Sequence, residues 1–428
     1  MCHNASSPFI AVRLQGTPGR FLIILAKMSE KERKCYEGKK VVVTGGAGYF
    51  GSRLGYALSE KGAEVTLFDI REPRHSKGLT FVKGDVSNKE HVRAVVKGAD
   101  YVFHSASYGM SGREQLNKEL IEKVNIQGTQ NIIEACIQLS VAHLVYTSTY
   151  NVIFGSNEIH EGDEALPYLP LDEHTDHYSK TKSISEQNVL KANKTNLPSG
   201  DYLRTCALRP AGIYGEGEER HLPRIVNYIE KGLFSFTYGR GESKVDFVHV
   251  DNLVLAHVGA GSALTGKAPL AAGEAYFISD GRPINNFEFF KPLVEGLGYK
   301  YPTLRLPFVL VYVLAYLTEI IHSVVGRYIY NFQPLLTRTE VHKTGVTHYF
   351  SIAKARSHFQ YTPKVHDLSG VVKHFREQGR GRRLRKAGSG LWYHVVNVII
   401  GLFFASLLFS FLPTIETIPV FGFPSTVI

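Results

Sequence analysis

Short apolar runs alternate with amphipathic stretches over the first half of the chain. The first run is Lys40-Val-Val-Val-Thr44, and similar runs follow at 64–69, 79–84, 101–104, 143–147 and 205–209. Helical spacing of apolar residues separates them, most clearly over 114–138 and 177–194. This alternation predicts an α/β fold, a Rossmann-type doubly wound parallel sheet with its ligand at the carboxyl ends of the strands.

The pattern changes after Gly215 and predicts a smaller lobe that covers the substrate end of the sheet. We expect helices over 220–232, 287–297 and 306–325 and short strands at 234–238 and 245–248. The predicted organisation follows the chain in this order: N-terminal extension 1–39, dinucleotide-binding domain with the catalytic residues 40–214, C-terminal substrate-binding lobe 215–375, basic linker 376–390, transmembrane helix 391–412 and short tail 413–428.

Two long apolar segments suggest contact with a membrane. Residues 391–412 carry no formal charge and, as a helix, would span about 30 Å, the thickness of a bilayer core. Basic residues flank this segment only on its N-terminal side, which places the catalytic part in the cytosol by the positive-inside rule. The other segment, 306–326, is interrupted by Glu319 and His322. We expect it to be a helix of the folded domain that touches the membrane surface, and a second span is the alternative.

The amino-acid composition argues against nucleic-acid binding and against a metal site. The chain of 428 residues has 49 basic and 39 acidic side chains, and the excess lies mainly within 1–40 and 372–387. A nearly neutral body with basic ends is not typical of a nucleic-acid binder, so we expect no nucleic-acid partner. The four cysteines fit neither a disulfide framework nor a zinc pattern, and the 18 histidines show no ligand spacing. We therefore predict no metal site.

A glycine-rich turn follows the first predicted strand. Gly45, Gly48 and Gly51, with Tyr49 and Phe50 between them, lead into a helical pattern. Glycines at such a strand-to-helix turn let the backbone approach a pyrophosphate, so the sequence predicts a dinucleotide site.

Other predicted cofactor contacts lie at the ends of later strands. Asp69 ends the second strand, where a carboxylate binds a ribose 2′-hydroxyl and repels a 2′-phosphate, which favours NAD. Because the basic Arg71 lies close in sequence, NADP remains the less favoured alternative. Ser105, Ala106 and Ser107 follow the fourth strand and are further candidates.

Hydroxyl groups and a Tyr–Lys pair form the candidate catalytic set. Thr147-Ser148-Thr149 ends the fifth strand, and Tyr178 and Lys182 lie one helical turn apart on one face. A nearby ammonium lowers the pKa of a phenol, so Tyr178 can accept a proton from an alcohol while hydride leaves for nicotinamide. Lys182 would also hold the nicotinamide ribose. Thr149 would hold the substrate oxygen, with Ser148 as the alternate.

The chain resembles the extended short-chain dehydrogenases/reductases, within them the 3β-hydroxysteroid dehydrogenase branch, and most closely family 42E. The motifs are TGGAGYFG at 44–51, FHSASYGMSG at 103–112, VNIQGT at 124–129, YTSTYNV at 146–152, YSKTK at 178–182, LRPAGIYG at 208–215 and DFVHVDNL at 246–253. The resemblance implies an NAD(P)-dependent oxidoreductase for a steroid or sterol, anchored in the endoplasmic reticulum membrane, with homodimers common in the family.

The resemblance also assigns residues by motif. Asp85 and Val86 would lie near the adenine, Pro210 and Ile213 would border the nicotinamide, and Asn125 would support the active-site helix. One position departs from the family, because Thr149 stands where a serine is usual. The added methyl group puts substrate fit in doubt more than the chemistry.

The sequence is compatible with three functions. The leading hypothesis is a membrane-anchored NAD-dependent 3β-hydroxysteroid or sterol dehydrogenase. A nucleotide-sugar epimerase or reductase is the alternative among enzymes, since extended members share the Tyr–Lys set, although the apolar segments disfavour a highly polar substrate. A non-catalytic NAD-binding scaffold is the third, and the intact Tyr178 and Lys182 weigh against it.

Overall fold

The computed structural model describes residues 34–382 apart from 75, 77, 111 and 329–335. The predicted transmembrane helix 391–412 and the tail 413–428 lie outside the described residues. Within the described ranges no helix has both the length and the apolarity needed to cross a membrane.

A seven-stranded parallel sheet forms the centre of the fold. Its order is β11-β7-β5-β4-β1-β2-β3, so the sequence order reverses between β1 and β4. This topology confirms the predicted Rossmann-type sheet. The strands are β1 Lys40–Thr44, β2 Glu64–Asp69, β3 Thr80–Lys83, β4 Tyr101–His104, β5 His143–Thr147, β7 Arg204–Pro210 and β11 Glu274–Ile278.

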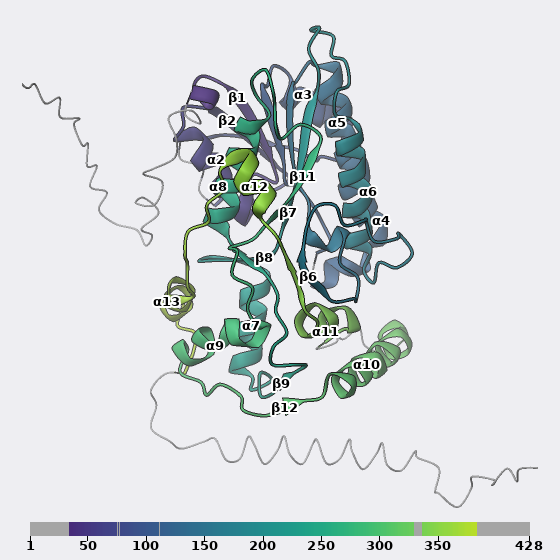
Figure 1. The fold of residues 1–428 in the computed structure, drawn as a ribbon, viewed down its shortest axis with the longest axis vertical. Coiled ribbons are helices and arrows are strands. Elements are labelled where there is room, and N and C mark those ends of the chain that lie inside the picture. Colours follow the sequence, from purple (N-terminus) through teal and green to yellow (C-terminus); the bar gives the residue numbers. More distant parts are fainter. Residues whose placement is uncertain (1–33, 75, 77, 111, 329–335, 383–428) are drawn as a thin grey trace, which may run out of the picture. The chain divides into compact units, whose positions relative to one another are not determined.

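Helices cover both faces of the sheet (Figure 1). One face carries α2 Tyr49–Ser59, α8 Val250–Ala263 and α12 Ala353–Phe359. The other carries α3 Lys89–Val96, α4 Lys118–Glu122, α5 Gly128–Gln138 and α6 His177–Lys191.

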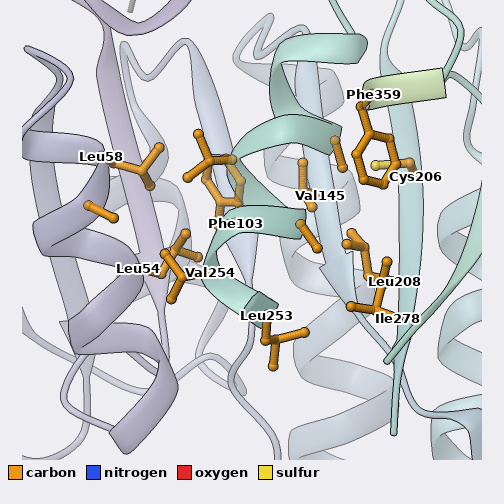
Figure 2. Packing of buried hydrophobic residues seen from close by; sticks show 14 of the residues in the cluster. Leu54, Leu58, Phe103, Val145, Cys206, Leu208, Leu253, Val254, Ile278 and Phe359 are labelled. Carbon is orange, nitrogen blue, oxygen red and sulfur yellow. The ribbon is translucent and has the colours of Figure 1, made fainter. Parts of the chain in front are cut away.

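The first face buries one large apolar cluster. Figure 2 shows part of this cluster, with Leu54 and Leu58 of α2, Leu253 of α8, and Phe103 and Val145 of the strands among the labelled residues. Burial of this kind contributes roughly 25 cal/mol for each Å² of apolar surface. A second buried apolar cluster fills the other face. The central strands are therefore largely apolar on both faces, as the uninterrupted runs in the sequence suggested.

Two features of the central fold differ from the sequence prediction. The predicted helix 114–138 is divided into a 3₁₀ turn Gly112–Leu116, α4, a π-helical turn η2 Lys123–Gln127 and α5. The seventh strand, β11, and helix α8 come from beyond residue 215 and join the sheet and its cover. The boundary predicted between 214 and 215 stays a prediction, with segments from both sides of it in the central fold.

The remaining elements form the lobe at the carboxyl ends of the strands. Its helices are α7 His221–Glu230, α9 Asn286–Gly296, α10 Phe308–Tyr328, α11 Arg338–Gly345 and α13 Ser369–Glu377. Short strand pairs complete it: β6 Ile159–Gly162 with β13 His348–Phe350, β8 Gly212–Tyr214 with β10 Phe247–His249, and β9 Thr237–Tyr238 with β12 Arg305–Leu306.

The lobe holds the last described residues in place. Arg380 forms an ion pair with Glu230 of α7, with Nη2 2.7 Å from a carboxylate oxygen, and the Gly381 N–H donates to the same carboxylate. The first part of the predicted linker 376–390 is therefore folded onto the lobe.

Helix α10 has one apolar face that the residues described by the structure leave exposed. Val311 and Ala315 are buried, whereas Val309 is 70% exposed. The other exposed large apolar residues of this helix repeat at helical spacing, and they are Leu310, Val313, Leu314, Tyr316, Leu317, Ile320 and Ile321. The predicted helix 306–325 is present and is apolar on its outer side.

Candidate active site

A cavity of about 3420 Å³ runs along the carboxyl ends of the strands and under the lobe. Most residues predicted to bind cofactor or substrate lie in its wall, whereas Lys182 and Asn125 lie behind it. The wall residues are Gly45, Gly48, Tyr49, Phe50, Gly51, Asp69, Asp85, Val86, Ser105, Ala106, Ser107, Ser148, Thr149, Tyr178, Pro210 and Ile213.

The glycine turn packs too closely for side chains. Gly45 has φ +68°, and a Cβ there would lie 2.9 Å from the Ala106 nitrogen. A Cβ on Gly51 would lie 2.2 Å from the Gly45 carbonyl oxygen. Gly48 is the N-cap of α2, so the positive end of this helix faces the cavity. This geometry is suited to a diphosphate.

Asp69 is fixed at the end of β2. One carboxylate oxygen accepts the Ala47 N–H at 3.1 Å and the other accepts the Arg71 N–H at 3.2 Å. The carboxylate therefore joins the glycine turn to the end of the second strand, where an adenosine ribose would lie.

The tyrosine in the glycine turn has an unsatisfied hydroxyl. Among the described residues the buried Tyr49 hydroxyl oxygen has no hydrogen-bond partner, and burial raises the pKa of this phenol. The Arg53 guanidinium lies 4.9 Å from the ring centroid. An unpaired polar atom beside the glycine turn fits a bound dinucleotide, because a ligand oxygen can complete its hydrogen bonding.

A buried chain of hydrogen bonds supports the ends of β1 and β4. His104 lies 2.7 Å from the Thr44 hydroxyl through Nδ1 and 2.9 Å from the Thr129 hydroxyl through Nε2. Ser105 donates its hydroxyl to the Thr44 carbonyl at 2.6 Å. Burial lowers the pKa of His104 to about 3, so this imidazole is neutral at physiological pH.

Asn125 connects the π-helical turn to the active-site helix. Its amide nitrogen donates to the Thr181 hydroxyl on α6 at 2.9 Å and to the Tyr108 carbonyl at 3.0 Å, and its oxygen accepts the Tyr108 N–H. The irregular turn presents Asn125 toward both segments, as π-bulges at functional sites commonly do.

Tyr178 lies at the start of α6 and is almost completely buried. Burial raises the pKa of its phenol to about 12, while the Arg220 guanidinium and a hydrogen bond with Ser107 act in the opposite direction. Asp176 caps α6 by accepting the Ser179 N–H at 2.7 Å, which fixes the turn that carries Tyr178.

Lys182 is buried beneath the end of β5. Its ammonium donates to the Thr147 carbonyl at 2.5 Å and lies 4.1 Å from the centroid of the Tyr146 ring. Burial lowers the pKa of Lys182 to about 7, and the Glu186 carboxylate opposes that shift. The expected lowering of the Tyr178 pKa by this ammonium is not seen here, where Arg220 provides the opposing positive charge.

The two candidate hydroxyls differ in their hydrogen bonds. The Thr149 oxygen accepts the Asn151 N–H at 3.3 Å and caps the 3₁₀ turn η3 Tyr150–Val152. The buried Ser148 hydroxyl has no partner among the described residues. Ser148 is therefore the freer of the two to bind a substrate oxygen, and the choice between them stays a prediction.

A buried ion pair behind the catalytic helix was not predicted from the sequence. Glu186, one turn after Lys182, accepts from Arg209 Nη2 at 2.7 Å and from the Tyr168 hydroxyl at 2.7 Å. Both charged side chains are almost fully buried. The i, i+4 spacing from Lys182 to Glu186 was visible in the sequence, but the pairing with Arg209 was not.

A histidine–aspartate cluster in the wall has poor geometry for a metal. Ligand atoms of His249, Asp251 and His366 lie within 4.8 Å of one another. The two imidazole rings are stacked with centroids 3.7 Å apart and planes 6° from parallel. Their in-plane lone pairs therefore run side by side and do not converge on one point.

The 3-beta hydroxysteroid dehydrogenase/isomerase family model matches residues 42–308. The chain belongs to this family. It is 58% identical over 378 residues to the zebrafish (Danio rerio) short-chain dehydrogenase/reductase family 42E member 1, covering 87% of this chain and 97% of that protein. The resemblance inferred from the motifs is confirmed, as is the prediction of a dehydrogenase that acts on a CH–OH group.

The chain is also similar to a more distant relative and to a solved structure. A mouse (Mus musculus) protein named sterol-4-alpha-carboxylate 3-dehydrogenase, decarboxylating, is 35% identical over 331 residues, covering 77% of this chain and 88% of its own. The Bordetella bronchiseptica enzyme WbmH, solved in complex with NAD+, matches with TM-score 0.58 and 21% identity over 80% of this chain and 99% of that one. This last likeness establishes the fold alone.

Proposed function

We propose that the protein uses NAD to oxidise the 3β-hydroxyl of a steroid or sterol. The observation that carries the proposal is the position of Tyr178, which shares one cavity with the glycine turn and with the hydroxyls that end β5. The names of the family and of the mouse relative support a steroid or sterol as the substrate class.

The residues of the chain can divide the chemistry among them. Ser148 or Thr149 would hold the substrate oxygen, and Tyr178 would accept the hydroxyl proton at its phenolic oxygen. Lys182 would keep the end of β5 in place through Thr147 and contribute positive charge when protonated. When bound, NAD takes up the hydride.

The cofactor would be held by backbone and carboxylate groups already in place. Gly45–Gly51 would hold the diphosphate at the start of α2, and Asp69 would bind the adenosine ribose. Asp69 supports NAD over NADP, because a 2′-phosphate placed beside this carboxylate would be repelled.

Turnover by full-length protein tests the proposal. Membranes carrying the chain are incubated with NAD and a panel of 3β-hydroxysteroids and sterols, and NADH formation is compared with that of Tyr178→Phe. We expect turnover that the variant loses while it retains NAD binding. A panel that gives no turnover above the variant, together with turnover of a nucleotide sugar, would support the epimerase or reductase alternative.

We further propose that the protein resides in the endoplasmic reticulum membrane with its catalytic domain in the cytosol. Residues 391–412 would form the anchor. The exposed apolar face of α10 would lie on the cytosolic surface of the same bilayer, as amphipathic helices do. Nine residues, 382–390, separate Gly381 from Leu391. Ten Cα–Cα steps reach at most about 35 Å, so the lobe that holds Gly381 would remain near the membrane.

Two measurements on the full chain test this arrangement. An Asn-x-Thr acceptor added after Ile428 should be glycosylated, whereas Asn193-Lys-Thr should not. A fluorophore on Val313→Cys, in a cysteine-free background, should be quenched by nitroxide lipids, and the same fluorophore on exposed Lys97→Cys serves as the control. An unmodified C-terminal acceptor, or equal quenching at both positions, would contradict the corresponding part of the proposal.

A further inference from the structure

Lys343 of α11 reaches from the lobe to the first turn of the catalytic helix α6. Its ammonium lies 2.9 Å from a carboxylate oxygen of Asp176, and the two side chains, 26% and 14% exposed, lie in the cavity wall. The same carboxylate accepts the Ser179 N–H at 2.7 Å and the Ser179 hydroxyl at 2.9 Å. Asp176 is therefore both the N-cap of α6 and the partner of a cation from a distant segment.

Helix α11 is itself fixed to two other elements of the lobe. Arg338 donates through its backbone N–H and through Nε to the Glu319 carboxylate of α10, each at 2.7 Å. Glu340 of α11 accepts from Arg224 of α7 at 2.5 Å. The ammonium is therefore presented to α6 from a helix that is held on two sides.

The ion pair compensates a carboxylate that lies two residues before Tyr178. Burial would raise the pKa of Asp176, but Lys343 and the hydrogen bonds from Ser179 together hold it below its usual value. The ionised carboxylate adds to the effect of burial, which raises the pKa of Tyr178. Loss of the ammonium would therefore leave an uncompensated negative charge near a phenol that must itself become negative.

Other titratable groups around Asp176 do not supply this compensation. They are Tyr150, His174, Tyr178 and Lys180. The two phenols carry no positive charge, and burial lowers the pKa of the imidazole, so it is neutral at physiological pH. Lys180 donates its backbone N–H to the Asp176 carbonyl at 3.3 Å. Among the described residues, Lys343 is the cation that forms an ion pair with this carboxylate.

We propose that Lys343 is a positioning residue for the reaction, which acts through Asp176 to hold the start of α6 and to compensate the negative charge near Tyr178. The inference rests on the proposed function and extends its machinery into the lobe. An N-cap fixes the first turn of a helix, and a buried carboxylate can do so in its charged form only while a counter-ion is present.

The pH dependence of kcat/KM in full-length protein tests this role, with NAD and a 3β-hydroxysteroid of the panel above. Lys343→Met should move the acid limb of the profile, where Tyr178 becomes protonated, to higher pH by about one unit. At pH 7 this shift is a loss of about tenfold, which alkaline buffer should recover. Lys343→Arg should keep the wild-type profile. The double variant Asp176→Asn, Lys343→Met should return close to it, because asparagine still caps the helix and no charge is left unpaired.

Lys354→Met is the matched control. Lys354 of α12 is 25% exposed and pairs with Glu274 at 2.6 Å, so its replacement removes a similar ion pair away from the cavity wall. We expect an unshifted profile for this variant. A loss for Lys343→Met that is the same at every pH would indicate a structural role only and would overturn the proposal. A shift that the double variant retains in full would exclude action through Asp176, and this variant decides the matter even where Lys343→Met does not fold.

Hydrogen–deuterium exchange separates this inference from the proposed function, because it requires no turnover. The amides of 179–182 should exchange about tenfold or more faster in Lys343→Met than in wild type at the same pH, and near the wild-type rate in Lys343→Arg and in the double variant. Absence of turnover with every steroid would contradict the proposed function, while the exchange rates would still decide the role of Lys343. Equal exchange in wild type and Lys343→Met would overturn it.

Discussion

The charge state of the catalytic side chains is governed mainly by burial. Tyr178 and Lys182 are both shifted toward their neutral forms, because the protein interior solvates charge poorly. These two side chains therefore carry less charge than the same groups would in water. This is a common state for groups that must gain or lose a proton during a reaction.

Replacing Lys182 should lower kcat while the protein remains folded. We expect Lys182→Met to lower kcat for steroid oxidation by about 100-fold or more, because both the ammonium and its bond to the Thr147 carbonyl are lost. Lys180→Met, on the same helix but outside the site, should keep near wild-type kcat. Steady-state kinetics measures kcat, and circular dichroism checks that each variant is folded. A folded Lys182→Met with near wild-type kcat would contradict the predicted role.

Asp69 should control the choice of cofactor. Asp69→Ser removes the charge that would repel a 2′-phosphate, so we expect the ratio of kcat/KM for NADP to that for NAD to rise about tenfold or more. Glu72→Ser, a neighbouring charge change beyond the end of β2, provides the comparison. Wild-type protein that already prefers NADP would show that Arg71 has the greater influence.

At the level of elements, α6 is the helix through which the site is assembled. Its N-terminal turn is capped by Asp176, its middle is bonded to Asn125 through Thr181, and its later turn is paired with β7 through Glu186. These contacts hold one face of the helix against the ends of the strands. The positions of Tyr178 and Lys182 therefore depend on residues that take no part in proton transfer.

Breaking the buried pair should be costly, whereas removing both charges should be less so. We expect Glu186→Gln to lower the free energy of unfolding by about 3–5 kcal/mol, because Arg209 is left buried without its counter-ion. The double variant Glu186→Gln, Arg209→Met should recover part of that loss. Urea unfolding of the three proteins tests this, and a double variant less stable than the single one would contradict it.

For the whole molecule, buried histidines set the response to acid. Burial lowers the pKa of His104 and His249 to about 3, and that of His143, His257 and His348 to about 4. The unfolded chain binds protons near pH 6.5, so between about 6.5 and 4 it holds more protons than the folded protein. Stability must then fall as the pH falls through this window.

Asp246 acts in the opposite direction. Burial raises the pKa of this carboxyl to about 7, so its contribution to stability is present at low pH and is lost as the pH rises from about 4 to 7. Burial also raises the pKa of three further carboxyls, Glu60, Glu164 and Asp280. It also lowers the pKa of four further histidines, His174, His221, His342 and His366, so the histidines remain the more numerous. The net prediction is therefore that acid destabilises the protein.

Urea unfolding at pH 7, 6 and 5 measures this response. Each buried histidine removes up to about 1.4 kcal/mol for each pH unit below 6.5, and His143→Gln should flatten the pH dependence by about that amount. His160→Gln, at an exposed position, should leave it unchanged. A free energy of unfolding that rises toward pH 5 would contradict the assignment.

Homodimer formation, which the family resemblance implies, stays a prediction. Because the stability of a dimer depends on protein concentration, that concentration should be the same in all unfolding measurements.

Sequence alone determined the features that depend on local pattern and on spacing. The apolar runs located six strands of the central sheet, because strands buried on both faces are made mostly of apolar residues. The glycine turn, Asp69 and the Tyr178–Lys182 pair were identified because each needs particular residues at fixed intervals. The apolar exterior of α10 was visible in the same way, as a helical segment interrupted late by Glu319.

Tertiary structure decided what depends on contacts between distant segments. Nothing local marked β11 or α8 as parts of the central fold, because the pairing of β11 with β7 involves residues far apart in sequence. The π-helical turn follows from the bonds of Asn125 to Tyr108 and Thr181, which a helical pattern does not encode. The link between Arg220 and Tyr178 and the ion pair of Glu186 with Arg209 arise likewise, because charges interact through space and the fold alone sets those distances.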